Sequence, residues 1–114
     1  MLTLPVKNGN RTQNLMTATV AKKIPAIRAQ DGKGEDAIVY VKFFTPFSSW
    51  TWFITELDPE TGEMFGKVYS HLCPEGEWGY SSLVEMSETV VGGMAIERDA
   101  WWKPKPMRDC KMGV

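Results

Sequence analysis

Two adjacent runs rich in β-branched and aromatic residues constrain the fold more than any other feature of this sequence. Residues 37–45 (AIVYVKFFT) and 50–57 (WTWFITEL) have the composition of strands and are separated by a break of hairpin length. Residues 58–63 (DPETGE) then combine a proline suited to the second position of a turn with a glycine that tolerates positive φ. Residues 64–72 follow as the return strand, so the centre of the chain is predicted to be an antiparallel sheet.

Two short helices are predicted beside this sheet. In residues 17–24, Thr17 is a helix cap, apolar residues recur near helical spacing, and Pro25 disfavours continuation. Ser82 and Glu85 have the spacing of a capping box, which predicts a helix to about residue 88. Residues 73–76 are predicted to form a turn, residues 77–80 a brief strand, and residues 94–102 a last strand.

These elements predict an α+β protein with a single antiparallel sheet of about 4–5 strands and two short helices. A chain of 114 residues has the length of one domain. We expect a flexible leader over residues 1–14, a single α+β domain over residues 15–106, and a basic tail over residues 107–114. Alternation along residues 50–57 predicts that the face carrying Thr51, Phe53 and Thr55 is half exposed to water.

Several classes of protein are disfavoured by composition. The sequence has no apolar run of 18 residues and no start typical of a signal peptide, so we expect no membrane association. Its two cysteines, Cys73 and Cys110, do not make a disulfide framework, which favours a reducing cytoplasm. The glycine pairs lack the pattern of a phosphate-binding loop. We predict no catalytic residue, no bound metal and no cofactor.

The net charge of −1 conceals an uneven distribution along the chain. Residues 1–33 carry a net charge of +5, residues 34–99 of −9, and residues 100–114 of +3. A solvated acidic surface between basic ends is one interpretation. The other is an acidic face that docks on a basic partner or competes with nucleic acid. Direct nucleic-acid binding is disfavoured by the isoelectric point of about 5.8.

A group of charged residues invites a chemical interpretation. We predict that Glu56, Glu97, Arg98 and Asp99 form a structural ion-pair cluster, in which the guanidinium ties down the carboxylates. The alternatives are that Glu56, Glu97 and Asp99 converge to bind a divalent cation, that they act as acid and base, or that they contact a partner.

Aromatic residues are the strongest sign of a binding surface, because thirteen of them are more than one sheet face can hide. Trp101 and Trp102 are adjacent, so at least one is expected to be exposed unless the tail folds over both. Next to Lys103 and Lys105, they are typical of a protein-binding hot spot or of a stacking platform for single-stranded nucleic acid. The predicted partner-binding residues are acidic and aromatic: Asp58, Glu60, Glu63, Glu75, Glu77, Trp78, Trp101 and Trp102.

Four motifs occur in a specific order: IPAI at 24–27, VKFFTP at 41–46 with WTWFITE at 50–56, WGYSSLVE at 78–85, and IERD at 96–99. Together they resemble a family of small proteins of unknown function that occurs on bacterial plasmids, integrative elements and phages. The resemblance covers about residues 18–106. The first 14 residues and the pair Trp101-Trp102 depart from the pattern, so contacts made there are expected to be particular to this chain.

This resemblance implies an accessory protein of a mobile element, made in the bacterial cytoplasm, and implies no reaction. The predicted function is binding to a host or defence-system protein complex, inhibiting a nuclease or effector (anti-CRISPR or anti-restriction). One alternative is a nucleic-acid-binding protein of plasmid maintenance, using Lys22, Lys23, Arg28, Lys103 and Lys105. Another is a small metal-dependent or acid–base enzyme at Glu56, Glu97 and Asp99. A homodimer is also open, because an exposed edge strand favours association.

Overall fold

The computed structural model describes residues 3–9, 13–46 and 48–110. Its helices are α1 (Ala18–Lys23) and α2 (Leu83–Glu88), with single 3₁₀ turns η1 (Gly34–Asp36) and η2 (Met107–Asp109). Its strands are β1 (Val6–Lys7), β2 (Asn14–Met16), β3 (Ile38–Val39), β4 (Val41–Phe44), β5 (Thr51–Leu57), β6 (Glu63–Ser70), β7 (Cys73–Ser82), β8 (Val90–Val91), β9 (Met94–Ala95), β10 (Glu97–Arg98) and β11 (Lys105–Pro106).

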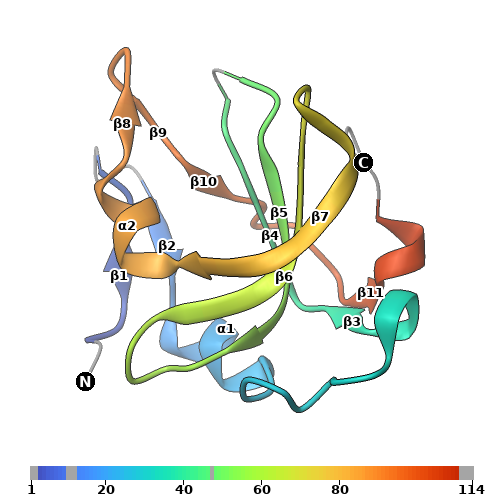
Figure 1. Cartoon of the computed structure of the whole chain (residues 1–114). Helices are drawn as coiled ribbons and strands as arrows, with labels where there is room; N and C mark the ends of the chain where they lie inside the picture. The colour runs from blue at the N-terminus through green and yellow to red at the C-terminus, as the bar shows by residue number, and fades with distance from the viewer. Residues whose placement is uncertain (1–2, 10–12, 47, 111–114) are drawn as a thin grey trace.

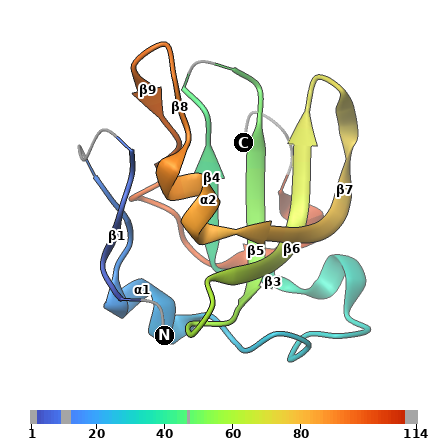
Figure 2. The same ribbon diagram turned by 60° about the vertical axis from the view of Figure 1, so that its left-hand side comes forward.

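Within the described residues, the main sheet has five strands in the order β10-β4-β5-β6-β7, all antiparallel (Figures 1 and 2). Three two-stranded pairs accompany it: β1–β2, β3–β11 and β8–β9. The predicted α+β class is therefore confirmed, with little helix. The prediction of a single sheet is incomplete, because residues before β4 and after α2 also form three two-stranded pairs.

The hairpin between β5 and β6 forms where the sequence predicts it. Gly62 has a φ of 82°, and its N–H donates to the carbonyl of Asp58 at 2.8 Å. The side chain of Asp58 accepts from the N–H of Glu60 at 2.9 Å. These local bonds close the turn with residue types that favour it.

Strand β5 is buried on both faces, so the predicted half-exposed face is wrong. Ile54 and Leu57 pack in one hydrophobic core, whereas Phe53 packs in a second core on the other face. A β-bulge between Ile54 and Glu56 shifts the alternation of side chains by one residue, which is why Ile54 and Leu57 share a face. The structure buries Phe53 and Thr55 almost completely.

The second core is covered by the end of the chain. Strand β11 pairs with β3, and η2 carries Met107 onto this face, where Met107 and Cys110 are buried. Burial raises the pKa of the Cys110 thiol to about 11. The strand predicted over residues 94–102 is divided into two short strands, β9 and β10. The chain then leaves the sheet in a turn after Asp99. Of the predicted tail, residues 111–114 lie outside the described residues.

Both predicted helices are confirmed with their caps. The N–H of Val20 donates to the side chain of Thr17 at 3.2 Å, and the N–H of Glu85 donates to Ser82 at 3.2 Å. The segment predicted as a flexible leader includes β1, which pairs with β2. Its residues 1–2 and 10–12 lie outside the described residues, and the predicted domain boundaries stay a prediction.

Strand β7 overturns the predicted turn at residues 73–76. The chain reverses earlier, between Ser70 and Cys73, which face each other across the ladder. The N–H of Leu72 donates to the hydroxyl of Ser70 at 3.1 Å within this turn. Pro74 then fits inside a strand because β7 is an edge strand, where a missing N–H donor is tolerated.

Candidate functional site

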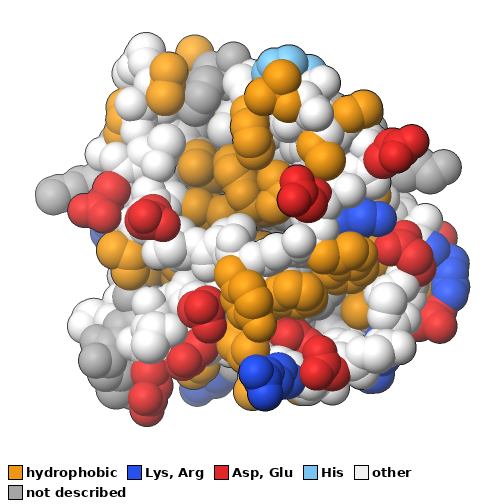
Figure 3. Space-filling model, viewed as in Figure 1, with side chains coloured by type: hydrophobic (Ala, Val, Ile, Leu, Met, Phe, Trp, Pro, Cys, Tyr) orange, Lys and Arg blue, Asp and Glu red, His pale blue; other side chains and the backbone are white. Residues whose placement is uncertain are grey.

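A groove of about 440 Å³ lies between the main sheet on one side and α2 with the β8–β9 hairpin on the other. We call it the tryptophan groove. Its lining comprises Thr45, Trp50, Trp52, Ser81, Ser82, Glu85, Met86, Thr89, Val91 and Ile96. Figure 3 shows hydrophobic side chains gathered in a hollow of this face, with acidic side chains around it.

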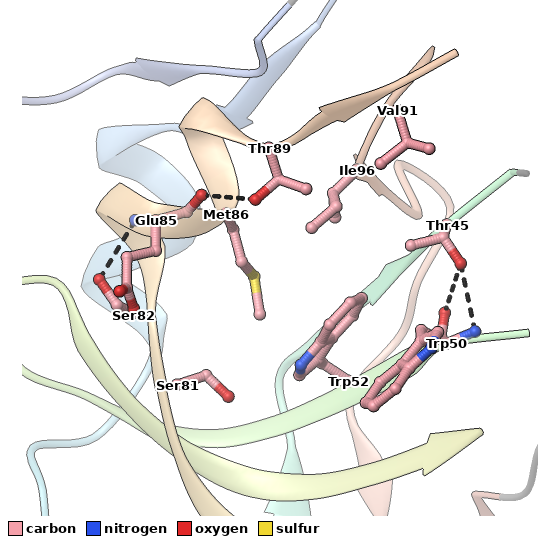
Figure 4. Close-up of a pocket in the computed structure, with 10 residues that line it drawn as sticks. All are labelled: Thr45, Trp50, Trp52, Ser81, Ser82, Glu85, Met86, Thr89, Val91 and Ile96. Carbon is pink, nitrogen blue, oxygen red and sulfur yellow. Dashed lines mark hydrogen bonds between the residues drawn. The ribbon is translucent and has the colours of Figure 1, made fainter. Parts of the chain in front are cut away.

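Two tryptophans form the sheet side of the groove. Trp50 and Trp52 are two residues apart across the start of β5, so alternation directs both to one face. Their rings stack with centroids 6.0 Å apart and an interplanar angle of 26°. The Thr45 hydroxyl accepts from the Trp50 N–H at 3.2 Å, which fixes the backbone beside the groove (Figure 4). Met86 points from α2 toward the rings.

The β8–β9 hairpin adds exposed apolar surface to the rim. Val90, Val91 and Met94 are exposed, although each is hydrophobic. Gly92 and Gly93 have positive φ values of 58° and 81°, the conformation that a tight hairpin turn requires. Exposed apolar side chains gathered beside a groove are typical of an interaction surface.

An acidic pocket of about 480 Å³ adjoins the tryptophan groove and shares Ser81, Ser82 and Glu85 with it. Asp58, Thr61, Glu63 and Tyr80 complete its lining. Among the described residues, neither lining includes a lysine or an arginine. The two hollows therefore meet at the end of β7, where the first is mainly apolar and the second is acidic.

Strand register places a further carboxylate on this surface. Trp52 lies opposite Val68, and Val68 lies opposite Glu77. Residues directly opposite one another point to the same face, so Glu77 is on the groove face at the edge of the sheet. We call Asp58, Glu63, Glu77 and Glu85 the acidic rim.

The predicted acidic binding residues are thus partly brought together. Asp58 and Glu63 line the acidic pocket, and Glu60 is exposed on the same turn. Glu77 borders the groove, whereas Glu75 lies nearer the start of β7, where it is exposed. The sequence analysis did not select Glu85, which lines both hollows.

The predicted aromatic binding residues are not on this surface. Trp78 points to the opposite face, where its ring stacks on Phe65 with centroids 5.7 Å apart. Trp102 packs against the second core, and its indole N–H donates to the carbonyl of Val39 at 3.0 Å. Trp101 is 90% exposed, in the turn that follows β10. One of the two adjacent tryptophans is therefore exposed, as the sequence predicts.

Among the described residues the predicted ion-pair cluster is not formed, and Glu56 lies away from its other three members. Glu97 pairs with Phe44, and Phe44 pairs with Thr51, which is five residues from Glu56. Those five residues span roughly 16 Å along β5. The ion pairs that the structure records among the described residues are Lys67–Glu35 and Arg108–Asp36, neither from the cluster.

Glu56 has a structural partner of another kind. It is 3% exposed, and its two oxygens accept from the N–H groups of Arg28 and Gln30, each at 2.8 Å. Arg28 has a φ of 76°, unusual for a residue with a side chain. The carboxylate therefore holds a turn of the chain between α1 and β3 against the sheet.

Arg98 is also held by backbone rather than by carboxylates. Its guanidinium donates to the carbonyls of Asn14 and Leu15, each at 3.1 Å. The side chain of Gln13 bonds to both the N–H and the carbonyl of Arg98, at 2.8 and 2.7 Å. Burial lowers the pKa of the guanidinium, and the charge of Asp99 opposes that shift. Arg98 thus attaches the N-terminal hairpin to β10.

Within the described part of the chain, no group of three or more histidine, cysteine, aspartate or glutamate side chains is placed to hold a metal ion. Those same residues include no helix with the length and apolar character needed to cross a membrane.

A family model described as a protein of unknown function, DUF2958, matches residues 12–108. The chain belongs to the DUF2958 family. No curated protein and no solved structure gives a significant match. The DUF2958 match confirms membership of an uncharacterised family, and the link to mobile elements stays a prediction.

The groove of this DUF2958 chain contains residues that the sequence analysis did not select: Trp50, Trp52, Glu85, Met86, Val91 and Ile96. Signals for some were present. Apolar pairs on both sides of Gly92-Gly93 are typical of a hairpin, and Trp50 with Trp52 had to share one face. The sequence pattern does not indicate that α2 and the β8–β9 hairpin lie over that face.

Proposed function

We propose that this DUF2958 chain is a non-enzymatic binding protein that holds a basic segment of a partner protein in its tryptophan groove. The observation that carries the proposal is the pairing of apolar and acidic surface. Aromatic and aliphatic side chains line the groove, carboxylates surround it, and the lining residues include no cation among those described. Such surfaces favour partners with lysine or arginine around an apolar anchor.

Each half of this surface has its own role in binding. Burial of partly exposed Trp50 and of the β8–β9 hairpin against a partner stabilises the complex, because large aromatic and apolar side chains dominate the free energy of binding. The acidic rim attracts a basic partner over several ångströms and raises the association rate. We therefore expect binding to weaken as salt concentration rises.

Basic protein surfaces are typical of complexes that handle nucleic acid. Together with the resemblance to proteins of mobile elements, this supports a nuclease or effector complex of a bacterial defence system as the partner. Inhibition would follow if the chain occupied a basic groove that the nucleic acid needs. This identity rests on association and on charge, and no reaction is proposed for the chain itself.

A matched pair of charge reversals tests the proposal. Glu85 and Glu88 are both exposed on α2, but only Glu85 lines the groove. Tagged wild-type protein, Glu85→Lys and Glu88→Lys are used to capture proteins from a nuclease-treated bacterial lysate. We expect Glu85→Lys to lose about tenfold or more of the captured partner, since like charges replace attraction. Equal capture by both variants would refute the groove assignment.

Nucleic-acid binding is a second candidate, favoured by the position of Trp101. Its ring is 90% exposed, and the Asp99 side chain accepts from its N–H at 2.9 Å, which orders the turn. Lys23 and Arg98 line one small cleft beside this turn, so basic residues from distant segments approach each other. Exposed aromatics next to cations stack on unpaired bases.

The second candidate predicts that Trp101→Ala weakens retention of a single-stranded oligonucleotide in a gel shift at low salt. Loss of one stacking contact is expected to lower the affinity by about fivefold to a hundredfold. Trp50→Ala, on the groove, serves as the control and should leave retention unchanged. If wild-type protein retains no oligonucleotide at low salt, the second candidate is wrong.

A further inference from the structure

Strand β7 offers an open edge beside the tryptophan groove. It is the outermost strand of the main sheet, with β6 on one side and, among the described residues, no strand on the other (Figure 2). In an antiparallel strand, alternate residues direct their N–H and carbonyl groups away from the neighbour. The outer side of β7 therefore presents backbone groups that another extended chain can bond to.

The two halves of this edge differ in how well they are protected against pairing with another strand. The first half contains Pro74 and the carboxylates of Glu75 and Glu77, which are features that discourage pairing with another strand. The second half, residues 78–82 (WGYSS), contains neither proline nor charge. Its length suits a short added strand of about 17 Å. Ser81 and Ser82 in this half line both the groove and the acidic pocket.

The groove face of this half has space for incoming side chains. Gly79 lies opposite Gly66, so β6 and β7 carry no side chain on that face at this row of the sheet. A Cβ atom added at Gly79 would have no atom within 4 Å, whereas one at Gly66 would meet the backbone of Phe53. Gly66 is thus required by close packing, but Gly79 is not required by the fold. The opening at Gly79 is available to a ligand.

We propose that an extended, basic segment of a partner protein pairs with residues 78–82 as an added strand of the main sheet. This inference rests on the proposed function. An apolar side chain of the segment lies on the groove face beside Gly79 and Ser81, and a lysine or arginine lies near Glu77 or Glu85. A second copy of this chain is disfavoured as the occupant, because pairing two β7 edges brings two acidic rims together.

The first test uses peptides selected from a random library displayed on phage against the full chain. The strongest binder is then synthesised in two N-methylated forms, one for each set of alternate residues. An added strand bonds to β7 through only one set, so one form should lose about tenfold or more in affinity and the other should not. We expect the selected sequences to carry apolar and basic residues at positions two apart, so that both lie on the groove face of the added strand.

The second test changes the protein. Gly79→Val and, independently, Ser81→Val fill the groove face of β7 with a residue type that favours strands. Both variants are expected to keep their thermal unfolding midpoint and to lose about tenfold or more in peptide affinity. The midpoint separates a blocked site from a damaged fold.

Several results would overturn the proposal. They are equal effects of the two N-methylated forms, selected peptides with helical spacing, no enrichment over the Gly79→Val protein, or a dimer that Gly79→Val disrupts. If lysate capture depends on Glu85 but both N-methylated forms bind alike, the groove binds protein without strand addition. If capture does not depend on Glu85, the proposed function fails as well.

Discussion

Replacing Glu56 with alanine is expected to lower the free energy of unfolding by about 3 kcal/mol, the largest effect of any single change we describe. The buried carboxylate accepts the N–H groups of Arg28 and Gln30, each at 2.8 Å. Alanine leaves both donors without their partner, and the N–H of Gln30 is buried. Unfolding in urea, followed by tryptophan fluorescence, measures the change.

Two further variants establish the cause of this loss. Glu56→Gln keeps the size of the side chain but removes its charge and turns one acceptor into a donor, so it should recover only part of the stability. Glu60→Gln removes an exposed carboxylate from the nearby turn and should change stability by less than about 0.5 kcal/mol. A Glu56→Ala protein as stable as wild type would contradict the structural role.

Arg98→Met is expected to lower the free energy of unfolding by about 2–3 kcal/mol. The change keeps an apolar stem but removes the donors to the carbonyls of Asn14 and Leu15. Because these bonds attach β2 to β10, the N-terminal hairpin should loosen first. Hydrogen exchange of the amides around β2 should therefore increase more than exchange within β5.

The control for Arg98 is Glu97→Gln, which distinguishes backbone anchoring from an ion pair. If the Glu97 carboxylate held the guanidinium, neutralising Glu97 would cost a comparable amount. The structure gives the guanidinium backbone partners instead, so we expect Glu97→Gln to change stability by less than about 0.5 kcal/mol. A loss near that of Arg98→Met would restore the ion-pair interpretation.

The sequence predicted what depends on neighbouring residues. The turn at residues 58–63 and the caps at Thr17 and Ser82 each depend on side chains within a few positions, and all three form as expected. The second core depends instead on Met107 reaching Phe53 from more than fifty residues away. No local sequence pattern specifies that approach, so the face of β5 that carries Phe53 was predicted to be half exposed to water.

The candidate site shows the same division. The acidic turn was selected because its charges are close together in the sequence, and Asp58 with Glu63 does line a pocket. The fate of Glu56 could not be foreseen, since its partners are backbone N–H groups made available by a left-handed residue, Arg28. Charge patterns predict ion pairs more readily than carboxylates bonded to backbone.

Strand β5 links the two cores through adjacent residues. Ile54 belongs to one core and Phe53 to the other, and Trp52 on the groove side is next to Phe53. Neither core can therefore lose its packing without exposing a strand that the other needs. We therefore expect the chain to unfold in one cooperative step, and a loss of packing in the second core should disturb the groove through β5.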